Sequence, residues 1–132
     1  MYEYEKILLT FLTIINQVKI YHWQTLSYSR HITSGNLYSQ LDKIIDKFIE
    51  ALQGRIILEN NNPHFRILLN DKMNSIILKN YSDGDAFMLI FNIKTYLESD
   101  ELISTISKYT DLVTLKDEML TIINNSGYLF SL

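Results

Sequence analysis

The sequence contains no cysteine, so the protein can form neither a disulfide nor a thiolate metal site. It has one proline and four glycines among 132 residues, and this scarcity of chain-breaking residues predicts a few long elements. The net charge of −3 supplies no basic field of the kind that binds nucleic acid by bulk electrostatics. These absences exclude several common classes of site and are compatible with an intracellular protein.

The amino-terminal segment lacks the features of a signal peptide. Its first residues, MYEYEKILLTFLTII, carry no positive n-region and no small-residue cleavage site. Polar residues, among them Thr10, Thr13 and Gln17, interrupt the apolar run, so it falls short of a membrane span. We therefore expect no secretion by a signal peptide and no membrane partner.

The remaining composition, with 47% hydrophobic residues, is that of a globular protein, and the length suits a single domain over residues 1–132. Apolar residues recur in steps of three and four, which predicts helices over about residues 3–26, 29–52, 83–97 and 110–129. Gly54 is expected just beyond the end of the second helix, and residues 98–101 are expected to break the third. Five residues of the third helix are expected to face inward: Phe87, Ile90, Phe91, Ile93 and Leu97.

Residues 55–83 have no regular apolar period and contain the strongest break in the chain, Asn60 to Pro63. Apolar clusters at 65–69 and 76–78 suggest a short helix pressed against the others. A connection of this length can cross a bundle from end to end, so that the second and third helices run parallel. The predicted fold is all-α, a four-helix bundle with a long crossover between the second and third helices.

The stretch from Tyr21 to Gly54 contains the candidate chemistry. It carries His22 and His31 near its start and Asp46 and Glu50, four residues apart, near its end. Imidazole and carboxylate groups together suit iron, zinc or manganese. For the carboxylates, a solvated face paired with Lys43 and Lys47 is the simpler interpretation. A single histidine on an apolar stripe, like His22, is more often a hydrogen-bonded core residue than a ligand.

Helix geometry separates these candidate ligands within one chain. His31 and Asp46 are fifteen positions apart, about 22 Å along one helix at 1.5 Å per residue. Metal–ligand bonds are about 2 Å long, so one ion cannot bind both groups of the same helix. Two copies of this helix, packed antiparallel about a two-fold axis, would bring the histidines of one chain to the carboxylates of the other.

The motif His22-Trp23, His31, Asp46 and Glu50 resembles the metal-site signature of the Dps-type ferritins, the DNA-protection proteins of starved cells. The chain is most similar to ferritin-like proteins of phages and large DNA viruses, which share HWQT, a following histidine, a D-x-x-x-E ending near QG, and a terminal segment from Asp111-Leu112 through DEML to Tyr128-Leu129. The resemblance implies a ferritin-like bundle that forms a homodimer or larger homo-oligomer through its second helix. It also implies an intersubunit iron site with His22 and His31 as nitrogen ligands, Asp46 and Glu50 as oxygen ligands, and Trp23 beside them.

Two departures from the Dps pattern reduce this expectation. Gly35 stands where those proteins carry another aspartate, which implies one metal ion and at most a vestigial ferroxidase activity. The basic DNA-binding tail is missing, so nucleic acid is not expected as a partner. The alternative is a non-enzymatic, virus-encoded structural protein that keeps the bundle, lacks metal chemistry and contacts other virion proteins. The expected location is the host cytoplasm or the virion. His64, Asp117 and Glu118 are expected at the surface.

Overall fold

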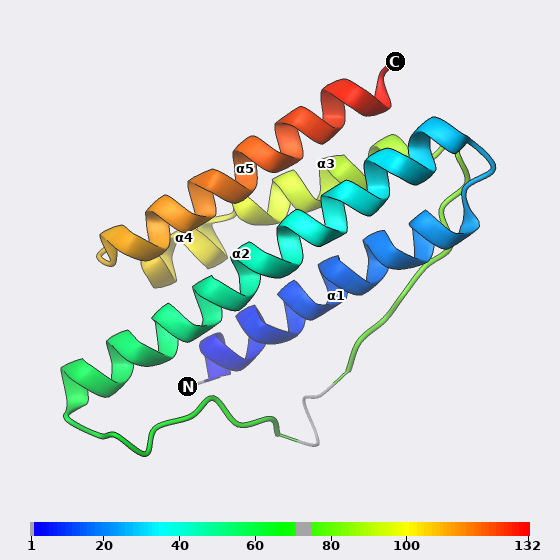
Figure 1. The fold of residues 1–132 in the computed structure, drawn as a ribbon. Coiled ribbons are helices and arrows are strands. Elements are labelled where there is room, and N and C mark those ends of the chain that lie inside the picture. Colours follow the sequence, from blue (N-terminus) through cyan, green and yellow to red (C-terminus); the bar gives the residue numbers. More distant parts are fainter. Residues whose placement is uncertain (1, 71–74) are drawn as a thin grey trace.

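A computed structural model of the protein describes residues 2–70 and 75–132, and within these ranges all regular structure is helical (Figure 1). Four long helices, α1 (Tyr2–Gln24), α2 (Tyr28–Asn60), α3 (Ala86–Leu97) and α5 (Thr110–Phe130), lie side by side. A short helix, α4 (Asp100–Ile106), follows α3. The predicted all-α class is confirmed. None of these helices is long and apolar enough to cross a membrane.

Helix α2 is two turns longer than the sequence pattern predicts. It begins as expected, because the Ser27 side chain at the N-cap accepts a hydrogen bond from the Arg30 amide at 3.3 Å. It then continues through Gly54 to Asn60, and Asn61 ends it in the left-handed conformation at a φ of 50°. The prediction that α2 ends at Gly54 is therefore wrong. Glycine costs about 1 kcal/mol in a helix, less than is gained by burying Ile56 beyond it.

The connection from α2 to α3 follows α1 along its length. The Asn70 amide donates to Glu5 near the start of α1, and Lys79 pairs through its backbone with the Gln17 side chain at 2.6 and 2.8 Å. Asp83 accepts a hydrogen bond from the Tyr21 hydroxyl near the end of α1. Helix α3 consequently starts at the end of the bundle where α2 starts, and the two run in the same direction (Figure 1).

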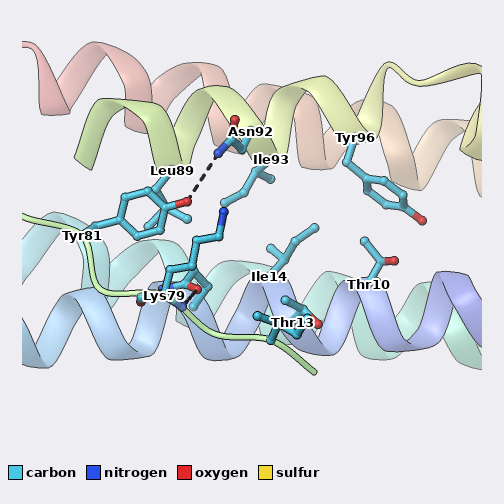
Figure 2. Close-up of a pocket in the computed structure, with 11 residues that line it drawn as sticks. Thr10, Thr13, Ile14, Lys79, Tyr81, Leu89, Asn92, Ile93 and Tyr96 are labelled. Atoms are coloured by element: carbon cyan, nitrogen blue, oxygen red, sulfur yellow. Dashed lines mark hydrogen bonds between the residues drawn. The ribbon is translucent and has the colours of Figure 1, made fainter. Parts of the chain in front are cut away.

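Residues 75–85 of this connection, here called the strap, lie over the gap between α1 and α3 (Figure 2). The short helix predicted from the apolar clusters is absent from residues 65–69 and 76–78, which have no regular secondary structure. Side chains on α1 hold the strap backbone, and these bonds replace the internal hydrogen bonds of a helix.

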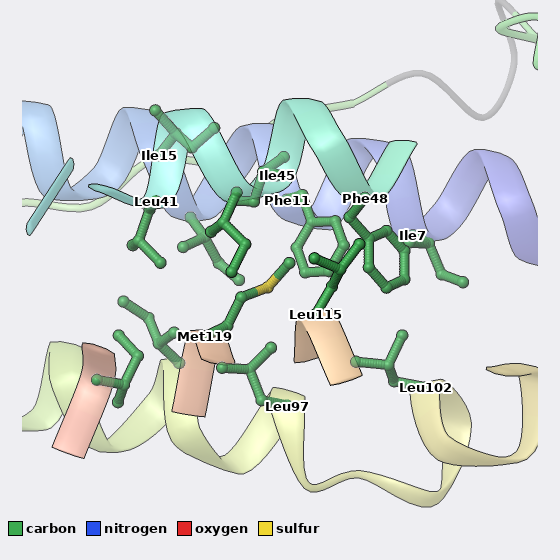
Figure 3. Packing of buried hydrophobic residues seen from close by; sticks show 14 of the residues in the cluster. Ile7, Phe11, Ile15, Leu41, Ile45, Phe48, Leu97, Leu102, Leu115 and Met119 are labelled. Atoms are coloured by element: carbon green, nitrogen blue, oxygen red, sulfur yellow. The ribbon is translucent and has the colours of Figure 1, made fainter. Parts of the chain in front are cut away.

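The core lies between α2 and its neighbours, α1 and α5, and extends to α3. Phe11 of α1 and Phe48 of α2 meet edge to face, with ring centroids 5.2 Å apart. Met119 of α5 reaches into the middle of the core (Figure 3). Leu97 and Leu102, on either side of the break between α3 and α4, are both fully buried, so the core continues across the break.

The predicted orientation of α3 is partly wrong. Phe87 and Phe91 are 51% and 53% exposed, although the prediction placed them inward. They lie one turn apart on the outer side of α3, because its buried stripe is Ala86, Leu89, Ile90, Ile93 and Leu97. At the end of α5, Phe130 is buried and Leu129 is 39% exposed. The break after α3 is confirmed, and Ser99 caps α4 by accepting a hydrogen bond from the Leu102 amide.

Candidate metal centre

His22 and His31 meet at the corner between α1 and α2. His22 lies in the last turn of α1 and His31 in the first turn of α2. Their rings stack with centroids 4.0 Å apart and planes inclined by 15°. His22 is half-buried and His31 is exposed, so the pair lies at the surface of the corner and not in the core.

The two histidines exchange hydrogen bonds with each other's backbone. His22 Nδ1 lies 2.7 Å from the carbonyl oxygen of His31, and His31 Nδ1 lies 3.0 Å from the carbonyl oxygen of His22. A carbonyl oxygen can only accept, so each Nδ1 carries the hydrogen and donates it. In a neutral ring this leaves the Nε2 lone pair free. Metal-binding histidines are typically oriented in this way by a second hydrogen bond.

Ser34 and Gly35 of α2 form the seat of the His22 ring. The buried Ser34 hydroxyl donates to the His31 carbonyl and accepts a second hydrogen bond from His22 Nδ1, both at 3.2 Å. A Cβ atom at Gly35 would lie 2.9 Å from His22 Cε1, closer than van der Waals contact allows. Gly35 therefore provides the space in which the ring of His22 lies against α2.

A network around Arg30 and Asp83 holds the same corner together. Arg30 donates to the backbone carbonyls of Asp83 at 2.7 Å and Phe130 at 3.0 Å. The Asp83 carboxylate accepts hydrogen bonds from Thr25 and Tyr21, which together hold its pKa below the usual range. Neither Arg30 nor Asp83 was predicted as part of this corner. Their positions are 53 residues apart, and no local pattern connects them.

In the HWQT motif of residues 22–25, some side chains form hydrogen bonds within the corner and another is exposed to solvent. Gln24 donates to Asn80 of the strap at 2.9 Å, and Thr25 bonds to Asp83. Trp23 has no such role and is 72% exposed. Leu26 and Tyr28 beside it are also exposed, at 95% and 79%. An apolar surface therefore adjoins the histidine pair.

Asp46 and Glu50 lie one turn apart on the exposed side of α2. A hydrogen bond to Asp46, together with its negative charge, raises the pKa of Glu50. The two carboxyl groups therefore lie close enough to interact. In the part of the chain that the structure describes, no ion pair joins them to Lys43 or Lys47, so the salt-bridged face considered from the sequence is not formed.

The histidine pair and the carboxylate pair are separate clusters, each at most one half of the predicted site and called a half-site below. His31, Asp46 and Glu50 belong to one continuous helix, which places the two pairs about 22 Å apart. Among residues 2–70 and 75–132, no three histidine, aspartate or glutamate side chains gather closely enough to hold a metal ion. The other candidates are at the surface: His64 lies exposed in the connection, and Asp117 and Glu118 are exposed on α5.

Comparison with protein-family models matches residues 22–130 to a family of unknown function, DUF5856. The chain belongs to this family. The matched region starts at His22 and includes His31, Asp46 and Glu50, so both half-sites lie within it. No curated protein and no solved structure matches the chain. The family description names no activity, and the function must be inferred from the site.

Proposed function

We propose that this protein is a Dps-like, ferritin-fold protein that pairs through α2 and holds one iron ion, or a similar ion such as Zn²⁺ or Mn²⁺, between two subunits. The observation that carries the proposal is the exchange of hydrogen bonds between His22 and His31. It commits both Nδ1 atoms to backbone carbonyls and leaves both Nε2 atoms as nitrogen ligands. His22 and His31 of one subunit would bind the ion together with Asp46 and Glu50 of the other.

The continuity of α2 supports this arrangement. The midpoint between His31 and the carboxylate pair falls near residues 39 and 40 of the helix. An antiparallel copy of α2 related by a two-fold axis at that point would place each histidine pair opposite a carboxylate pair. The exposed Trp23, next to His22, would then be covered by the second subunit.

The donor chemistry also supports the proposal. Two neutral imidazoles and two carboxylates form a set that suits Fe, Zn or Mn. A cation bound by Asp46 and Glu50 would offset the negative charge of Asp46, which helps to raise the pKa of Glu50. Gly35 stands where Dps-type proteins carry another aspartate, so the site has no third carboxylate beside the histidines, and any ferroxidase activity would be vestigial.

The course of the chain is consistent with a ferritin-like bundle. Such bundles have four long helices with one crossover connection, which makes the second and third helices parallel. Here the connection follows α1, and α3 runs in the same direction as α2. This agreement supports the fold assignment without depending on the metal.

Metal titration of protein purified without chelators tests the proposal. Calorimetry with Zn²⁺, and with Fe²⁺ under anaerobic conditions, is expected to give one tightly bound ion per chain. His31→Ala removes a nitrogen ligand and is expected to abolish this binding. His64→Ala is the matched control, because it removes an exposed histidine outside the site. If the wild-type protein binds neither ion, or if His31→Ala binds as well as wild type, the proposal is wrong.

The alternative, a structural protein without metal chemistry, is favoured by one observation. The hydrogen bonds of His22 and His31 join α1 to α2, a structural role that requires no ion. If this is their whole role, His31→Ala destabilises the apo protein, and metal ions leave the wild-type melting temperature unchanged. Under the metal-site proposal, an ion at a hundred times its Kd stabilises the wild-type protein by about 2.7 kcal/mol.

A further inference from the structure

A cavity of about 210 Å³ lies between α1, α3 and the strap, and it shares no residue with the metal half-sites (Figure 2). Its walls are apolar over most of their area and include Ile14 of α1, Ile77 of the strap, and Leu89 and Ile93 of α3. Direct packing between α1 and α3 is sparse, and the strap lines one side of the space that remains, which is open to solvent. The cavity therefore forms because the strap packs beside α1 and α3 where these two helices do not contact each other closely.

The strap is fixed in position over the cavity. The Gln17 side chain, only 6% exposed, bonds to both the amide and the carbonyl of Lys79. Three alternate residues of the strap, Ile77, Lys79 and Tyr81, line the cavity. One edge of the cavity therefore carries an ammonium group and a phenol, both from the strap.

Most polar groups of the wall are already bonded within the protein. The Thr10 and Thr13 hydroxyls donate to carbonyls of their own helix, and the Gln17 amide is occupied by the strap. Two donors remain. The Tyr81 oxygen accepts from the Asn92 amide at 3.4 Å, which leaves its own hydrogen free to donate.

The second donor is the Lys79 ammonium, whose side chain extends from the strap toward α3 (Figure 2). No carboxylate of residues 2–70 or 75–132 forms an ion pair with it.

We propose that this cavity binds a compact apolar monocarboxylate, with the apolar body between α1 and α3 and the carboxylate at Lys79 and Tyr81. Charge decides the class of ligand, because the two free groups at the edge are a cation and a hydrogen-bond donor. Size limits it, because a cavity of about 150 Å³ holds benzene. The present cavity suits a single ring with a short acidic side chain.

The test uses two probes of nearly equal shape, phenylacetate and the uncharged 2-phenylethanol. Each is titrated into the full-length, isotope-labelled protein, and amide chemical shifts are followed by NMR. Phenylacetate is expected to bind at least about tenfold more tightly, a difference of about 1.4 kcal/mol. The shifted amides are expected to be those of the strap and of the walls at Leu89 and Ile93.

Variants show whether the cavity and its charge are responsible. Lys79→Met keeps the length of the side chain and is expected to remove the preference for phenylacetate, whereas Lys47→Met, on the outer side of α2, is expected to keep it. Thr13→Phe fills the cavity from α1 and is expected to abolish binding of both probes. Ile77→Trp, at a position that is 74% exposed, blocks the cavity from the strap with less risk to folding.

Three results would overturn the proposal. The first is no saturable shift at cavity residues with about 10 mM phenylacetate, which corresponds to binding weaker than about 3 kcal/mol. The second is equal affinity for the two probes with no effect of Lys79→Met. The third is binding that survives in a folded Ile77→Trp variant, because the probes would then occupy another place.

Discussion

Replacing Gly35 by alanine tests whether the histidine pair depends on the space beside α2. The added methyl group would lie 2.9 Å from His22 Cε1 and 3.3 Å from Nδ1. The ring cannot move away while it keeps its hydrogen bond to His31 and its stacking contact. We therefore expect alanine to displace the ring of His22 and to break the hydrogen bonds between the two histidines.

Two opposing contributions determine how far Gly35→Ala changes the free energy of unfolding. Alanine is favoured over glycine within a helix by about 0.5–1 kcal/mol, and Gly35 has an ordinary helical φ. The two hydrogen bonds that would be lost contribute about 1 kcal/mol each. The free energy of unfolding is then expected to fall by about 1 kcal/mol, although the helix itself becomes more favourable.

Gly54→Ala supplies the matched control in the same helix. An added Cβ there meets no atom within 4 Å, so only the helix contribution remains, and the variant is expected to gain about 1 kcal/mol. Urea unfolding followed by circular dichroism, at one protein concentration and without metal, should separate the two variants by about 2 kcal/mol. If both substitutions stabilise the protein equally, the account of Gly35 is refuted.

Three further predictions concern the same corner and its surface. Arg30→Met removes the hydrogen bonds of a half-buried guanidinium and is expected to lower the free energy of unfolding by about 2–3 kcal/mol. Arg66→Met is the control: the hydrogen bonds of Arg66 reach only nearby backbone carbonyls, and its loss is expected to change the free energy of unfolding by less than about 0.5 kcal/mol. The lowered pKa of Asp83 means that its contribution to stability is complete above the usual aspartate value of about 4 and is lost as the pH falls through the lower native value. The urea midpoint should therefore fall between about pH 5 and about pH 3, and less steeply in Asp83→Asn; an equal slope in the two proteins would exclude this role. Trp23 is the only tryptophan and is exposed in the single chain, so its fluorescence should shift to the blue as the protein associates through α2, and a spectrum independent of concentration up to full association would contradict the proposed interface.

The positions of the helices could be predicted because burial imposes a three- and four-residue period on the sequence. The ends were harder to place, since Gly54 resembles a stop signal and only the burial of Ile56 shows that α2 continues. On α3, Phe87 and Phe91 share a spacing that also fits an inner face. Packing of the neighbouring helices decides which face is inner, and no local pattern contains that information.

Candidate ligands could be named from the sequence, but their geometry could not be predicted from it. The spacing of His31 from Asp46 and Glu50 on one helix was enough to predict two half-sites within a chain. The stacking of His22 on His31 depends on the path of the chain around the corner, which Asp83 helps to hold from a distant segment. Gly35 shows the difference most clearly. In the sequence it stands where the Dps-type proteins have a carboxylate, whereas in the structure its lack of a side chain leaves room for the imidazole of His22.

The central claim, a metal site shared between subunits, is tested most directly by mixing two inactive variants. His22→Ala/His31→Ala lacks the nitrogen half-site, and Asp46→Asn/Glu50→Gln lacks the oxygen half-site. Unfolded together and refolded, they form mixed dimers in which one site regains both intact halves and the other loses both. Each variant alone should bind no ion at this site.

The mixture should bind Zn²⁺ at about a quarter of the wild-type stoichiometry, because about half of the dimers are mixed and each of these has one complete site of two. Calorimetry of the refolded samples at equal total protein measures this directly. Recovery of about a quarter of the binding would establish the intersubunit site. If neither variant nor their mixture binds Zn²⁺ while the wild-type protein does, the two half-sites do not combine between subunits and the account is contradicted.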